Sequence, residues 1–132
     1  MKKTILLGTL ILTLFSSCQK SWEEKCVEDA QVYTETRCPY NITPTLAIDS
    51  MIYNPKNNCL LYYYSALGNL DNPELFTEEK KADYKIDLKQ TLINDISTRQ
   101  YKEHDVTFRY IYKSRKTKDV LLDIKFESKD YK

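Results

Sequence analysis

The sequence predicts an α+β fold in which an antiparallel sheet of about four strands, in the order ββαββ, carries one amphipathic helix on one face. Two pairs of segments with a two-residue period, each pair joined by turn residues, indicate two hairpins. One segment with helical periodicity separates the pairs. The chain has 132 residues and shows no internal repeat, so it is long enough for one domain with one modest core.

The first hairpin is predicted from residues 46–53 and 59–66. Residues 46–53 alternate between two faces, as they do in a strand. The connection 54–58 contains Pro55, which fixes φ, and asparagines, which tolerate left-handed backbone. The run from Leu60 to Tyr64 is apolar or aromatic on both faces, which predicts a central strand of the sheet.

A helix is predicted for residues 78–98. Thr77 is a good N-cap, and two glutamates follow it in the first turn. The apolar side chains fall in one broad helical arc, wide enough to cover a sheet. They are Ala82, Tyr84, Ile86, Leu88, Leu92, Ile93 and Ile96. The second hairpin follows, from the alternating segments 106–112 and 120–126.

Residues 18–45 are polar and show no sustained period. We interpret them as a lipidated tether and an irregular lead-in, with room for one short helix around residues 22–30. The single α+β domain is therefore expected to span residues 46–132.

The first 17 residues have the three-part layout of an export signal. Lys2 and Lys3 precede an apolar run over residues 5–15, and two small serines follow it. This run has about 11 residues, whereas a helix needs about 20 residues to cross a bilayer. A cleaved signal peptide is therefore predicted, and not a permanent membrane anchor.

The string Leu14-Phe15-Ser16-Ser17-Cys18 resembles the lipobox of bacterial lipoproteins, although Phe15 stands where these motifs usually have Leu or another aliphatic residue. The resemblance implies that Cys18 is acylated, becomes the first mature residue and anchors the protein in a lipid bilayer. The layout as a whole resembles small Bacteroidota lipoproteins. Gln19, in place of an inner-membrane aspartate, favours the outer membrane, on its periplasmic face or on the cell surface.

Four cysteines in an exported chain favour a disulfide over a metal site. With Cys18 lipidated, three thiols remain, which allow one internal bridge. Cys26 with Cys38 is the predicted pair, because closing this short loop would contribute about 3 kcal/mol. Cys38 with Cys59 is the alternative, and the sequence does not decide between them.

Several function classes are disfavoured by composition. Removal of Lys2 and Lys3 takes the formal net charge from +1 to about −1, which gives no electrostatic case for nucleic acid. Two glycines provide no phosphate-binding loop, and the single histidine, His104, lies in a polar connection. We therefore expect no enzyme, no metal and no cofactor.

The sheet face turned away from the helix is the predicted binding surface. Alternation places Arg109, Ile111 and Leu121 there, unless the lead-in folds back over this face. One side of the tyrosine-rich strand must join them, either Tyr63 with Leu61 or Tyr62 with Tyr64, and Tyr63 is the residue we include in the predicted surface. The predicted function is that of a membrane-anchored envelope lipoprotein with a non-enzymatic binding or accessory role, whose partner is an envelope protein or a glycan. An immunity or inhibitor lipoprotein directed against a toxin or hydrolase is one alternative, and a small envelope hydrolase is another.

Overall fold

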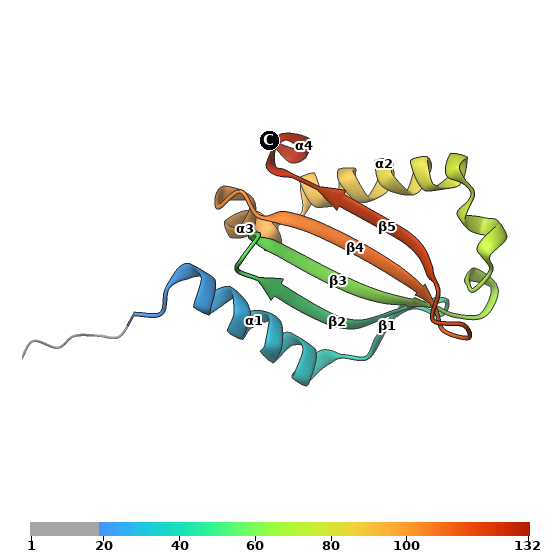
Figure 1. The fold of residues 1–132 in the computed structure, drawn as a ribbon, viewed down its shortest axis with the longest axis horizontal. Coiled ribbons are helices and arrows are strands. Elements are labelled where there is room, and N and C mark those ends of the chain that lie inside the picture. Colours follow the sequence, from blue (N-terminus) through green and yellow to red (C-terminus); the bar gives the residue numbers. More distant parts are fainter. Residues whose placement is uncertain (1–18) are drawn as a thin grey trace, which may run out of the picture.

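A five-stranded mixed sheet carries helices on one face in the computed structural model, which describes residues 19–132 (Figure 1). In sheet order the strands are β1 (Tyr40–Thr43), β2 (Leu46–Asn54), β3 (Cys59–Ala66), β4 (Thr107–Ser114) and β5 (Val120–Phe126). The helices are α1 (Trp22–Arg37), α2 (Glu78–Asn94), α3 (Arg99–Glu103) and α4 (Ser128–Tyr131), with 3₁₀ turns η1 (Gly68–Leu70), η2 (Pro73–Phe76) and η3 (Ile96–Thr98). None of the helices in this part of the chain combines the length and apolar character needed to span a membrane. The predicted signal peptide and Cys18 lie outside the described residues.

The α+β class and both hairpins are confirmed, whereas the strand number and the purely antiparallel sheet are wrong. β2 pairs with β3 and β4 pairs with β5 in antiparallel fashion, as predicted. The additional strand β1 pairs with β2 at the sheet edge. β3 and β4 are parallel, because the segment that contains α2 carries the chain back to the end where β3 began.

The lead-in is not irregular, since residues 22–37 form helix α1. Ser21 and Glu24 form a capping box: the Ser21 hydroxyl accepts from the Glu24 backbone N–H at 3.1 Å, and Glu24 accepts from the Ser21 N–H at 3.3 Å. Cys26 and Ala30 of α1 are buried in the same core as α2. The predicted domain start at residue 46 is therefore too late, because α1 belongs to the core.

Helix α2 begins after Thr77, as predicted, but ends at Asn94 and not at Thr98. Asp95 leaves the helical conformation, with φ −77° and ψ 111°, because its carboxylate caps η3 by accepting from the backbone N–H of Ser97 at 2.9 Å. Ile86, Ile93 and Ile96 are exposed, so the buried stripe of the helix is narrower than the predicted arc.

The core lies between the helices and one face of the sheet. The register of the parallel pair places Leu60, Tyr62 and Tyr64 of β3 beside Phe108, Tyr110 and Tyr112 of β4 on this face. Side chains that are almost completely inaccessible to solvent include Leu60, Leu92, Val106, Phe108, Leu122 and Phe126. β3 is the central strand, as predicted from its apolar character.

Candidate functional site

A groove of about 800 Å³ opens on the helical face of the sheet, between α1 and the corner that joins α2 to α3. Its floor is formed by residues of β2 and β3, and its two walls by α1 and by η3 with α3. The groove includes Tyr62 and Tyr64 of β3, the strand at the centre of the sheet. Figure 1 shows where β3 lies between α1 and α3. The volume is within the range of about 300–1,000 Å³ that is typical of small-molecule sites.

The floor consists of stacked tyrosines. Tyr62 stacks on Tyr110 with ring centroids 5.2 Å apart and planes 7° from parallel, and it also stacks on Tyr64 at 6.3 Å. Burial raises the pKa of Tyr62 well above its ordinary value, and burial likewise raises the pKa of Tyr64. Like ordinary tyrosines, both are neutral at pH 7, and their hydroxyls can donate and accept hydrogen bonds; burial extends this neutral state to higher pH.

The first wall is one face of α1. Residues at positions 28, 29, 32, 33, 36 and 37 follow one another at helical spacing and all line the groove. Arg37 lies over the ring of Tyr33, 5.6 Å from its centroid. Thr34 fixes α1 on β2, because its hydroxyl donates to the Met51 carbonyl and accepts from the Met51 N–H, both at 2.9 Å.

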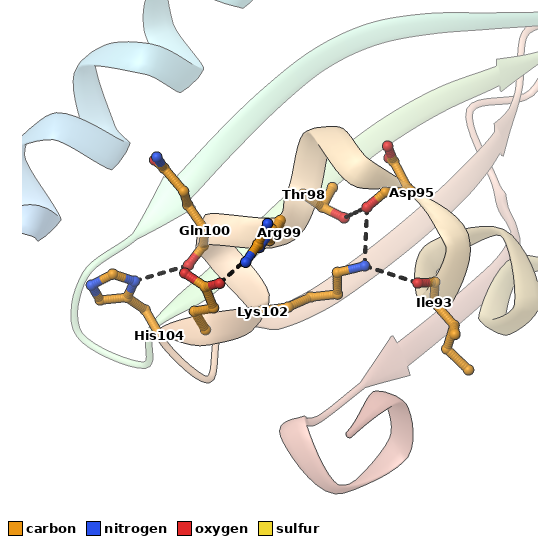
Figure 2. A network of polar contacts seen from close by, with 8 residues as sticks. Ile93, Asp95, Thr98, Arg99, Gln100, Lys102 and His104 are labelled. Atoms are coloured by element: carbon orange, nitrogen blue, oxygen red, sulfur yellow. Dashed lines mark hydrogen bonds and ion pairs between the residues drawn. The ribbon is translucent and has the colours of Figure 1, made fainter.

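Lys102 holds the second wall in place. Its ammonium donates to the carbonyls of Leu92, Ile93 and Asp95 at 2.8, 3.1 and 3.0 Å, as Figure 2 shows for the last two. Helix α2 has no basic residue in its own last turn, so a lysine from α3 satisfies its terminal carbonyls. This bonding fixes the corner at which Asp95 and Thr98 line the groove.

An aromatic stack joins the two walls at one end. Trp22, at the start of α1, stacks on His104 with ring centroids 3.7 Å apart, and its edge meets Tyr101 at 5.6 Å. A ring nitrogen of His104, Nδ1, is 2.8 Å from the Gln100 carbonyl oxygen (Figure 2). His104 was placed in a polar connection from the sequence; its side chain is exposed, and its stack on Trp22 also fixes the position of α1.

The opposite face of the sheet contains three of the four residues predicted to form the binding surface. Arg109 donates to both carboxylate oxygens of Asp123, at 2.9 and 2.6 Å, and this bonding holds the pKa of the Asp123 carboxyl below its usual value. The ammonium of Lys113 lies 5.2 Å from the centre of the Tyr63 ring. Ile111 is buried between its strand neighbours Tyr63 and Asp123.

The placement of Leu121 on that face is wrong. The ladder between β4 and β5 shifts register between Tyr112 and Lys113, so that Leu122 pairs with Tyr112 and Val120 pairs with Lys113. Leu121 is left over in this bulge and is buried in the core cluster. Simple alternation along β5 does not detect the shift.

The predicted bridge between Cys26 and Cys38 is absent, and Cys26, Cys38 and Cys59 are all free thiols. Cys26 lies in the second turn of α1, whereas Cys38 is its C-cap. The rise of a helix separates two such positions by about 18 Å, whereas a disulfide needs its Cα atoms within about 7 Å. This pairing is therefore incompatible with α1.

We expect Cys26 to react at least about tenfold more slowly with an alkylating reagent in the native protein than in the unfolded chain. Burial raises the pKa of its thiol to about 11, and the side chain is 1% exposed. Peptide mapping after timed alkylation measures the rate. A peptide that links Cys26 to Cys38 in protein taken from cells would contradict both the prediction and the helix.

Comparisons with known proteins give one family and one related fold. The sequence model of the family described as "Domain of unknown function (DUF8479)" matches residues 21–122, from the α1 N-cap into β5. Among solved structures, a Pseudomonas aeruginosa protein described as "a putative secreted protein" is similar, with a TM-score of 0.66 and 11% sequence identity. The match covers 86% of this chain and 100% of that chain, and at this identity it shows the fold alone. No curated protein matches the chain.

Proposed function

The chain belongs to the DUF8479 family, and we propose that it is an exported, lipid-anchored protein that binds a small ligand, without catalysis, in the groove between α1 and α3. The observation that carries this proposal is the floor of stacked tyrosines between two fixed walls. A concave site with an aromatic floor and a few polar groups is the usual form of a ligand site.

Export and anchoring are proposed from the first 18 residues, with Cys18 as the acylated residue and the outer membrane as the destination. The description of the Pseudomonas aeruginosa protein as secreted supports an extracytoplasmic location. Cys18 precedes Trp22, the first residue of α1, by only four positions in the sequence, so the groove would be held close to the membrane surface.

The groove is a better candidate for the ligand site than the opposite sheet face. On that face the charged groups bind one another: Arg109 pairs with Asp123, and Lys113 covers Tyr63. A ligand there would have to displace these contacts, which would offset part of its binding energy. The tyrosines of the groove require no such displacement, because their hydroxyls have no hydrogen-bond partner within residues 19–132.

The experiment is an NMR screen of the purified protein against a library of amines, sugars and neutral amphiphiles, with chemical-shift mapping of each hit. We expect the shifts to gather at Met51, Tyr62, Tyr64 and Tyr101. Val32→Trp should weaken binding by about tenfold or more, because Val32 lines the groove, is 50% exposed and can direct a larger ring into it.

Val27→Trp is the matched control. Val27 lies on the same helix, is 39% exposed and does not line the groove, so this variant should bind as the parent protein does. Shifts that gather instead at Tyr63 and Arg109 would move the site to the opposite sheet face and overturn the proposal. Equal binding by the two tryptophan variants would overturn it as well.

A further inference from the structure

Acidic side chains stand on both walls of the groove. Glu28 and Asp29 line it from α1, and Asp95 lines it from the corner before η3. Arg37 is the one basic residue among the described residues that line the groove, and it already lies over Tyr33. The lining therefore has three carboxylates against one guanidinium, so acidic side chains are in excess there.

These carboxylates are available to a ligand. Glu28 pairs with Lys20, and Asp29 pairs with Lys25 at 3.6 Å, but all four side chains are about half exposed, so water screens both pairs. Asp95 makes no ion pair within residues 19–132, and its contacts to Ser97 both use the same oxygen, Oδ1. The second oxygen of Asp95 remains open.

Tyrosine side chains line the groove together with these carboxylates, at Tyr62, Tyr64 and Tyr101. Burial raises the pKa of Tyr110, in the layer beside Tyr62, and the Asp95 carboxylate raises it further. Burial also raises the pKa of Tyr101 to about 12, and Asp29 contributes to this rise. Each wall thus places a carboxylate in the groove, and a cation with N–H donors could bind these carboxylates by charge-assisted hydrogen bonds.

Between the two acidic walls the lining is apolar. Val32, Ile42, Ile48 and Met51 line the groove together with the tyrosine rings. Methylene groups fit such a surface, whereas a sugar would leave most of its hydroxyls unpaired there. A complementary ligand therefore carries positive charge at its ends and methylene groups between them.

We propose that the groove binds a linear aliphatic polyamine, with one ammonium group at the α1 carboxylates and another at Asp95. This inference rests on the proposed function and specifies its ligand. The two terminal ammonium groups bridge the walls, and the methylene chain lies on Met51 and the tyrosine floor. Phenolic oxygens accept hydrogen bonds from the ammonium groups.

The test is isothermal titration calorimetry of the purified protein with spermine at physiological ionic strength. Asp95→Asn should weaken spermine binding by about tenfold or more, because it removes the charge opposite one ammonium group. The amide can still cap η3, since asparagine is a good N-cap, so the fold is retained. Asp29→Asn is a second variant and should weaken binding in the same direction from the other wall.

Asp87→Asn is the control for charge. It makes the same substitution on α2, where Asp87 is exposed and lies outside the groove lining, and it should change binding less than about twofold. Equal weakening by Asp87→Asn and Asp95→Asn would show general electrostatic attraction and overturn the proposal. A neutral diol of similar length is the control for the ligand, and it should not bind.

The outcomes of the two experiments distinguish a failure of the polyamine proposal from a failure of the proposed ligand site. If spermine does not bind while an uncharged hit of the NMR screen shifts the resonances of Tyr62 and Tyr64, the polyamine proposal is wrong. The groove is then still supported as the ligand site. If no compound shifts these residues, both proposals fail.

Discussion

Raising the pH above about 10 is expected to unfold the domain steeply, because its core contains tyrosines that cannot ionise in place. Burial raises the pKa of Tyr62, Tyr64 and Tyr110, and it raises that of Tyr112 to about 12. In the unfolded chain these hydroxyls release their protons at the ordinary tyrosine pKa of about 10.

Between the ordinary and the raised pKa the unfolded chain therefore binds fewer protons than the folded domain. The free energy of unfolding has its full value below about pH 10. Above that pH it falls by about 1.4 kcal/mol per pH unit for each such tyrosine. Four such tyrosines together lower the free energy of unfolding by about 5.6 kcal/mol per pH unit, which is comparable with the whole stability of a typical domain, about 5–15 kcal/mol.

Urea unfolding at a series of pH values measures this slope. Tyr110→Phe removes one of these hydroxyls and should reduce the slope by about 1.4 kcal/mol per pH unit. Tyr40→Phe is the matched control, since Tyr40 is 60% exposed on the edge strand β1, and its profile should follow that of the parent protein. If Tyr110→Phe leaves the slope unchanged, the pH dependence does not come from the buried tyrosines.

The strands were the predictable part of the fold, because their side chains alternate between core and solvent. Strands β3 and β5 have the predicted boundaries, and Asn58 adopts the left-handed conformation, φ 50°, that was expected in the first turn. The parallel pairing of β3 with β4 was missed, although a helix between two strands of one sheet favours it.

Only the first half of helix α1 was predicted, for a different reason. The helix buries only Cys26 and Ala30 and exposes Val27 and Val32, so it has no broad apolar stripe on one face. The sequence indicates the start of this helix only locally, because Ser21 and Glu24 have the spacing of a capping box. The short helix predicted for residues 22–30 covers the half of α1 that contains both buried residues.

The groove could not be predicted from the sequence once α1 was treated as irregular. Its first wall is α1, and its second wall exists because α2 ends at Asn94 and Lys102 fixes the turn that follows. The tyrosine excess on β3 and β4 was evident, but the sequence did not decide which side of β3 faces the helices. The register with β4 puts Tyr62 and Tyr64 beneath the helices and Tyr63 on the other face.

Cys18→Ala is expected to abolish stable membrane attachment, so that the protein is either left uncleaved or shed from the cell. Acylation of the Cys18 thiol precedes cleavage in the lipoprotein pathway that the lipobox implies. Two or more acyl chains give stable anchoring, because each buried methylene contributes about 0.8 kcal/mol. Among residues 19–132 the remaining cysteines lie within the fold, at Cys26, Cys38 and Cys59.

Detergent partitioning and the intact mass of the mature chain measure this effect. The parent protein should enter the detergent phase, begin at Cys18 and carry the added mass of acyl chains, whereas Cys18→Ala should not. Cys38→Ala is the matched control: it makes the same substitution at a partly exposed free thiol, and this variant should stay anchored and acylated. A parent protein that lacks lipid mass, or that begins at another residue, would contradict the proposed acylation of Cys18. The proposal that the groove binds a ligand would then apply to a domain without a lipid anchor.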